Sequence, residues 1–260
     1  MGHIHLATLP ASRKWRTVAS LLNEHAAARE VIAASARAAE KDLARAATDP
    51  VLASAIRLMA LVPKAAHGRD FAEGLRELEV VVPEHPMLAD ISVGVASALE
   101  RRPHGSTRSD FGEMVRRALV ATLTTGIGDT LPGQFDSDAE DVRRAAARLA
   151  RPESFSGTAR TFFGRLFADT LGSWLDRTLS VDIGSAAPFG SLRERDAFDR
   201  TLEQYCSDAT RIIRELSAAW YGRTLEREGT ITSERSAAYS ALAMNRIGEE
   251  LRHQRDAVHA

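Results

Sequence analysis

One stretch of this sequence, residues 191–222, constrains the fold more than any other. Its apolar side chains recur at alternating intervals of four and three residues, which places them on one side of an α-helix. The apolar seam consists of Phe198, Leu202, Tyr205, Ala209, Ile212, Leu216 and Ala219. Ser191 followed by Glu194 is typical of a capping box, and Gly222 marks the predicted end of the helix. We expect one central helix of roughly 30 residues whose seam other helices cover.

The rest of the chain also predicts helices. Caps, prolines and glycines divide the sequence into roughly nine of them. We predict an all-α multi-helix bundle with a short extended N-terminal arm, residues 1–11. Because residues 126–133 contain three glycines and a proline, we expect a boundary there between two lobes, residues 12–128 and residues 137–260. The 191–222 helix is predicted to form the centre of the second lobe.

Single residues set several of the expected helix boundaries. Asp49 followed by a proline opens a helix, and Pro63 is predicted to stop it because proline cannot continue the helical hydrogen bonds. Ser137 with Glu140 predicts a capping box for a later helix. Residues 79–82, Glu-Val-Val-Val, could form a strand, but a lone strand forms no sheet. We expect a loop there unless the segment pairs with the N-terminal arm.

The charges of the chain balance almost completely. With 34 basic and 35 acidic residues, no overall field attracts the protein to nucleic acid or to an anionic membrane. No run of about 18 apolar residues is present, and the first ten residues lack the pattern of a signal peptide. We therefore expect a cytoplasmic protein without a membrane span.

The chain has one cysteine, Cys206. A single thiol excludes an intramolecular disulfide and a cysteine-rich zinc site, which suits a reducing compartment. Because Cys206 lies beside the apolar seam, we interpret it as a small buried apolar residue, with a catalytic thiol as the alternative.

The last predicted helix carries a pattern that suggests catalysis. Arg246 precedes His253, and Arg252 precedes His259, each with six residues between them. Helical ribonucleases of the HEPN kind carry such a pair, separated by four to six residues. The resemblance implies a metal-independent homodimer in which the arginine stabilises negative charge and the histidine transfers a proton. Composition alone predicts about two such pairs in this arginine-rich chain, so exposed faces of a terminal helix are the alternative interpretation.

A second pattern suggests contact with nucleic acid. Arg144, Arg148 and Arg151 lie along one face of a predicted helix, at a spacing that could follow a phosphate backbone. Because Glu140 and Asp141 precede them, ion pairs on a solvated helix surface are the alternative interpretation.

Two large aromatic residues, Trp220 and Tyr221, stand at the predicted end of the central helix. Aromatic side chains in this position could anchor a partner protein. They could equally fill the end of the helical bundle, and we favour that interpretation.

We expect no metal site and no cofactor. His3 and His5 would lie on one side of the extended arm, but two imidazoles without a third ligand do not complete a site. Gly126 and Gly128 lack the preceding strand and the third glycine of a dinucleotide-binding loop. An acidic cluster resembles part of a calcium loop but lacks its central glycine and its final glutamate. This cluster consists of Asp136, Asp138, Glu140 and Asp141.

Two segments, residues 154–163 and 205–222, resemble parts of uncharacterised bacterial helical proteins. Such proteins occur in multi-gene clusters of the phage-defence type, and the resemblance implies a role in antiviral defence without assigning a functional residue. Our leading hypothesis is a non-enzymatic helical subunit or adaptor of a bacterial multi-protein complex, with other protein subunits as its partners. It predicts an exposed apolar or aromatic patch of interface size.

Overall fold

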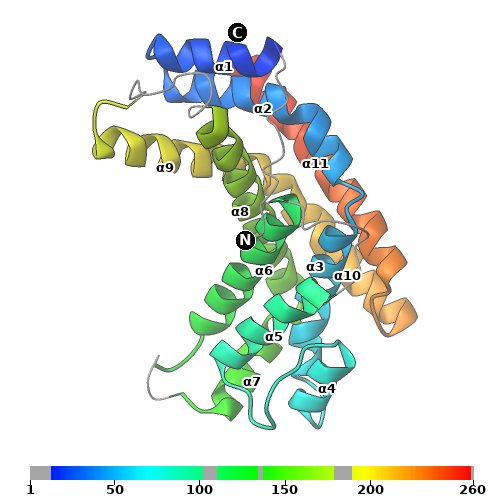
Figure 1. Ribbon diagram of the computed structural model, residues 1–260. Helices are drawn as coiled ribbons and strands as arrows, with labels where there is room; N and C mark the ends of the chain where they lie inside the picture. Colours follow the sequence, from blue (N-terminus) through cyan, green and yellow to red (C-terminus); the bar gives the residue numbers. More distant parts are fainter. Residues whose placement is uncertain (1–12, 102–109, 134–136, 179–188, 259–260) are drawn as a thin grey trace.

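The computed structural model describes residues 13–101, 110–133, 137–178 and 189–258 (Figure 1). Over these residues it contains eleven α-helices and no strand, which confirms the all-α fold. The helix count is higher than expected, in part because the predicted central helix is divided in two. In order, the helices are α1 (Arg13–Asn23), α2 (Ala28–Ala46), α3 (Pro50–Ala65), α4 (Phe71–Glu77), α5 (Leu88–Arg101), α6 (Asp110–Gly128), α7 (Ala139–Arg148), α8 (Pro152–Thr178), α9 (Leu192–Ala209), α10 (Arg211–Glu228) and α11 (Ser233–Val258).

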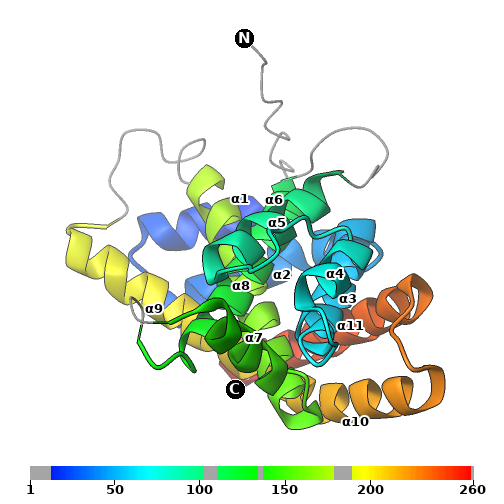
Figure 2. The same ribbon diagram turned by 90° about the horizontal axis from the view of Figure 1, so that it is seen from below.

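The helix at the centre of the molecule is α8. It is the longest helix, with 27 residues, and it packs against α6, α9 and α10. Figures 1 and 2 show α8 between α9 on one side and α3 on the other. The apolar side chains that α8 buries are Phe155, Ala159, Phe162, Phe163, Leu166, Phe167, Leu171 and Leu175. A second group of packed helices joins α11 to α2 and α3.

The predicted single helix over residues 191–222 is wrong, because the chain breaks at Thr210 between α9 and α10. Thr210 is buried, and its hydroxyl donates to the carbonyl oxygen of Ser207 at 3.0 Å. Nη2 of Arg160, from α8, donates to the same carbonyl oxygen at 3.3 Å. In a continuous helix this oxygen would accept the N–H group of the residue four positions later. The second helix then continues past Gly222 and ends at Gly229, which adopts a left-handed conformation with φ +68°.

The break at Thr210 also changes which side chains are buried. The first half of the seam is buried as predicted, at Phe198, Leu202, Tyr205 and Ala209. In α10 the buried positions shift to Ile213, Ser217, Tyr221 and Thr224. Ala219, a predicted seam residue, is exposed. The apolar spacing of a single straight helix therefore predicts the wrong buried residues beyond Thr210, where the chain changes direction.

The start of α9 matches the prediction, whereas the end of α3 does not. The hydroxyl of Ser191 accepts the N–H of Glu194 at 3.2 Å, and the Glu194 carboxylate accepts the N–H of Gly190 at 2.7 Å. Pro63 was expected to stop α3, but it lies inside the last turn of that helix. The N–H groups that follow Pro63 bond to carbonyl oxygens three residues earlier, so the helix closes with a tighter turn.

The capping box of α7 lies one residue later than predicted. The Asp138 side chain accepts the N–H of Asp141 at 2.8 Å, and the Asp141 side chain accepts the N–H of Asp138 at 3.2 Å. Ser137 does not cap the helix, because its hydroxyl donates to the carbonyl oxygen of Gly133. Glu140 instead pairs with Arg143 on the helix surface.

One continuous apolar core runs through the molecule, from Trp15 in α1 to Leu251 in α11. The structure therefore does not show the two predicted lobes. Residues 79–82 form a loop, as expected, and Val80 and Val82 are buried. No single helix of the described ranges is both long and apolar enough to cross a membrane, and the one pair that qualifies together, α2 with α3, is bent by 78°.

Candidate functional site

The arginine and histidine residues of the ribonuclease hypothesis lie on the surface of α11. Arg246 is exposed and pairs with Glu249 of the same helix at 3.1 Å. Arg252 pairs with Glu40 of α2 at 3.1 Å, and His253 is exposed. His259 lies outside the described residues. Arg246 and Arg252, the two described arginines of this pattern, each pair with a carboxylate rather than with His253, so the hypothesis still depends on a second copy.

The face proposed to contact nucleic acid is exposed along its whole length. Arg144, Arg148 and Arg151 are all accessible to solvent. Arg144 pairs with Asp141 at 2.7 Å, which matches the ion-pair alternative for that residue. Arg148 and Arg151 have no ion pair with another residue of the described ranges.

Trp220 and Tyr221 lie in an aromatic cluster between α8, α10 and α11. The Tyr221 ring is 1% exposed and stacks on Phe155 at a centroid distance of 4.3 Å. Trp220 is partly buried and stacks on Tyr239 at 4.2 Å. Tyr221 is therefore part of the core, and Trp220 presents only part of its ring to solvent.

Cys206 is fully buried, and burial raises the pKa of its thiol to about 12. The negative charges of Asp169 and Glu203 act in the same direction. We predict that iodoacetamide modifies the folded protein at pH 8 about a thousandfold more slowly than an ordinary thiol, because only the thiolate reacts. Mass spectrometry should show full modification when the same reaction is run in denaturant.

The same shift predicts the direction of a pH effect on stability. The thiol pKa is higher in the folded chain than in the unfolded chain. The neutral thiol therefore contributes its full stability at any pH below the pKa of the unfolded chain. This contribution is lost as the pH rises towards the pKa of the folded chain. Stability measured by denaturant unfolding should therefore fall between about pH 9 and pH 12. Alkylation of native Cys206 at the rate of a free thiol would contradict both expectations.

The metal-binding residues considered from the sequence do not form a site where the structure describes them. His3, His5 and Asp136 lie outside the described residues. Among the residues that are described, no group of three or more His, Cys, Asp or Glu side chains could hold a metal ion.

A hollow lies where α9 bends into α10 against α8, and we call it the elbow groove. Its volume is about 640 Å³. Along α8 its floor carries small or short side chains at intervals of four, three and four residues. These floor residues are Gly157, Thr161, Gly164 and Ala168. A Cβ atom added at Gly157 would meet no atom within 4 Å, so the groove is open at that position.

Charged side chains line the walls of the elbow groove. They are Arg160, Arg165 and Asp169 of α8, Glu203 of α9 and Arg214 of α10. The walls around Asp169 remove part of its solvation, which raises the pKa of this carboxyl although it stays exposed on one side. The positive charges of Arg117 and Arg165 oppose that rise.

These charges are not mixed evenly along the elbow groove. α8 and α9 run in opposite directions, since Gly172 lies beside Leu202 and Gly164 lies beside Thr210. Asp169 and Glu203 therefore share one end, where both act on Cys206. α10 also runs opposite to α8, because Gly222 lies beside Pro152. The opposite end of the groove accordingly holds the charges of Arg160 and Arg214.

Arg165 occupies the middle of the groove wall. Its Nη2 donates to the hydroxyl of Thr125 at 3.2 Å. Its Nη1 is shielded from solvent and has no hydrogen-bond partner in the described part of the chain. An incoming acceptor group would satisfy this donor, because a buried guanidinium N–H without an acceptor is unfavourable.

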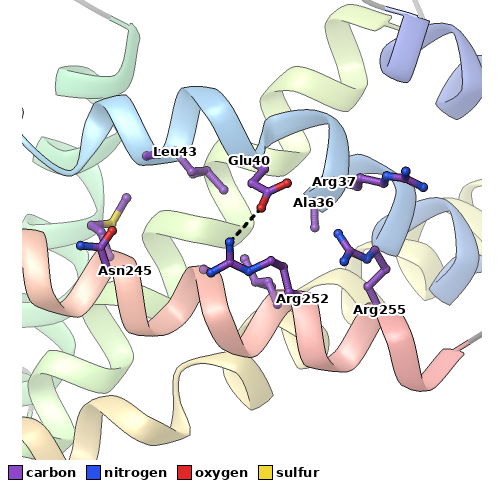
Figure 3. Close-up of a pocket in the computed structure, with 11 residues that line it drawn as sticks. Ala36, Arg37, Glu40, Leu43, Asn245, Arg252 and Arg255 are labelled. Atoms are coloured by element: carbon purple, nitrogen blue, oxygen red, sulfur yellow. Dashed lines mark hydrogen bonds and ion pairs between the residues drawn. The ribbon is translucent and has the colours of Figure 1, made fainter.

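None of the sequence patterns considered above indicated the elbow groove. The signal available was the spacing of Gly157, Thr161, Gly164 and Ala168, which places small side chains on one face of a helix. A smaller hollow of about 70 Å³ lies between α2 and α11 and includes Arg252 (Figure 3).

Comparison of the chain with protein-family models, curated proteins and solved structures found no match.

Proposed function

We propose that this protein is a helical adaptor whose elbow groove receives a helix of a partner protein. The observation that carries the proposal is the combination of a floor of small side chains with opposite charges at the two ends of one groove. The exposed apolar patch of interface size that the adaptor hypothesis predicted is not seen among the described residues, because their exposed large apolar side chains are spread over a loop and three helices. They are Val81, Met87, Val93, Leu192 and Leu242.

The floor of the groove suits the approach of another helix. Packed helices need axis separations of roughly 8–10 Å, and the shorter distances require small side chains at the contact. Gly157, Thr161, Gly164 and Ala168 recur at the helical spacing that such a contact uses. Between Gly157 and Asp169 the α8 axis rises by about 18 Å, which corresponds to about three helical turns of a partner.

The charged side chains that line the groove predict the charges of the partner helix. Arg160 and Arg214 at one end match carboxylates, because guanidinium groups bind carboxylates through paired hydrogen bonds. Asp169 and Glu203 at the other end match lysine or arginine. From residue 160 to residue 169 α8 rises by about 14 Å, although the Arg160 guanidinium itself reaches towards Ser207. We therefore expect a partner helix with acidic residues in one turn and basic residues about two turns away.

The groove also joins the two segments that resemble uncharacterised bacterial proteins. Residues 154–163 supply Gly157, Arg160 and Thr161, and residues 205–222 supply Ser207 and Arg214. This juxtaposition supports a role in a bacterial multi-protein complex. The phage-defence setting and the cytoplasmic location are part of the same proposal.

The substitution Gly157→Leu tests the proposal by filling the groove. Its Cβ atom enters open space, and replacing a helical glycine favours the helix, so the variant should fold. We expect the affinity for the partner to fall about tenfold or more, because the leucine occupies the volume of the docked helix. The readout is gentle purification from the source cells followed by native mass spectrometry and cross-linking.

The matched control is Gly248→Leu, since a Cβ atom at Gly248 also meets no atom within 4 Å and lies on α11, outside the groove. A supporting result needs a partner that is retained by this control, lost by Gly157→Leu and cross-linked to residues 157–169. A synthetic peptide of the cross-linked segment should then bind the protein and lose affinity with Arg214→Glu. Retention of the partner by Gly157→Leu, or a chain that purifies alone, would contradict the adaptor function.

A further inference from the structure

The hollow between α2 and α11, which we call the α2/α11 slot, has an apolar floor and a charged rim. Ala36, Leu43, Met244 and Leu251 form the floor. Arg37 and Glu40 of α2 and Arg252 and Arg255 of α11 form the charged part of the rim. Figure 3 shows Arg252 and Arg255 extending from α11 towards α2, with Glu40 pointing at Arg252. The slot is independent of the elbow groove, because no residue lines both.

Positive charge is in excess on this rim. Its one carboxylate, Glu40, lies 3.1 Å from Arg252. Nε of Arg255 forms an ion pair with Asp256 at 2.9 Å, and its Nη1 and Nη2 have no hydrogen bond within the described ranges. The Arg37 side chain also lacks an ion pair among the described residues. The Arg37 guanidinium and the two Nη nitrogens of Arg255 therefore have donor groups available for an anion.

A further arginine adds to the positive charge near this end. Burial raises the pKa of Tyr205 to about 12, Cys206 and Asp256 act in the same direction, and the positive charges of Arg255 and Arg29 oppose that rise. Both arginines therefore lie close enough to Tyr205 to act on the same hydroxyl. This hydroxyl donates to the carbonyl oxygen of Leu251 at 3.4 Å and so holds α9 against the slot.

The dipole of α11 explains only part of this cluster. Basic residues in the last turns of a helix interact favourably with its negative end, which accounts for Arg252 and Arg255. It does not account for Arg37, which lies in the middle of α2. The helix dipole also does not explain the open space beside these arginines. This space is seen at Gly248, where an added Cβ atom would meet no atom within 4 Å.

We infer that the α2/α11 slot binds a small organic anion, with its oxyanion at Arg255 and Arg37 and a short apolar tail over the slot floor. Guanidinium groups match the oxygens of phosphate and carboxylate alike. The slot volume of about 70 Å³ is about half that of an apolar cavity that holds benzene, so it accepts a tail of roughly two or three carbon atoms. The ligand class is therefore a short-chain organic phosphate or carboxylate.

Isothermal titration calorimetry of the full chain with ethyl phosphate, propionate and inorganic phosphate tests this site. We expect one ethyl phosphate or one propionate per chain with a Kd below about 10 mM. The comparison of these two ligands identifies the oxyanion, and inorganic phosphate, which has no tail, should bind more weakly. Arg255→Gln should weaken binding about tenfold, because a charge-assisted hydrogen bond is lost.

Two further variants separate specific binding from general attraction to positive charge. Gly248→Leu should fill the slot and abolish binding of ethyl phosphate and propionate, whereas Gly157→Leu, in the elbow groove, should leave it unchanged. Arg246→Gln removes one arginine of the same helix outside the slot and should also have no effect. Absence of binding at about 10 mM, or equal loss with Arg246→Gln and Arg255→Gln, would overturn the site. Unchanged binding to Gly248→Leu would do so as well, and each outcome leaves the adaptor proposal untouched.

Discussion

Replacement of Phe155 by alanine should lower the free energy of unfolding by about 3–5 kcal/mol. The Phe155 ring is 1% exposed and stacks on Tyr221 with an angle of 14° between the ring planes. It also lies 5.8 Å from the Trp220 ring, so its removal opens a cavity where α8 meets α10. Loss of the aromatic contacts adds to the loss of buried apolar surface, and pairs of this kind contribute about 0.5–1.5 kcal/mol beyond burial.

Urea unfolding followed by circular dichroism measures this effect. The matched control is Phe111→Ala in α6, where the ring is only partly buried and the expected loss is about half as large or less. A loss below about 2 kcal/mol for Phe155→Ala would show that neighbouring side chains close the cavity. In that case the aromatic cluster would not be the main contact between α8 and α10.

Gly94→Ala should also destabilise the fold, by about 1–3 kcal/mol. A Cβ atom at Gly94 would lie 2.8 Å from Cγ1 of Val80 and 2.9 Å from the carbonyl oxygen of Val81. The backbone oxygen cannot rotate away, so α5 or the loop over residues 79–82 must move. Thermal unfolding should show a lower Tm for this variant.

Gly157→Ala gives the opposite expectation and serves as the control. Both glycines lie inside helices, but the added methyl group at Gly157 enters open space. Its only effect should be the better helix propensity of alanine, which raises the stability by about 0.5–1 kcal/mol. If both variants changed the Tm in the same direction, the close contact of α5 with the loop would not be the cause.

Local signals in the sequence predicted the starts of α3 and α9. Asp49 and Ser191 each cap a helix through a side-chain oxygen that accepts a nearby N–H group. Such contacts involve residues two or three positions apart, so no other part of the chain is needed to form them. The α7 cap was predicted one residue too early, which is also a local error. Ser137 and Asp138 can both cap a helix, but only the Asp138 side chain accepts an N–H group of α7.

The predictions failed where a distant segment competes with a local pattern. The apolar spacing over residues 191–222 describes one helix, but the Ser207 carbonyl oxygen accepts from Arg160, which lies 47 residues away in the sequence. Burial of Thr210 against α8 then completes the break. The elbow groove exists because of this break, and it could not be predicted from residues 191–222 alone.

The sequence by itself determined that this protein is all-α, where α3 and α9 begin and which face of the first half of α9 is buried. These properties depend on hydrogen bonds and periodicities that span a few residues. The tertiary structure alone decided that α8 is the central helix and that Arg160, Asp169, Glu203 and Arg214 line one groove. It also brought Arg37 and Arg255 to one slot. Helix packing sets these positions, because it joins side chains that no local spacing relates.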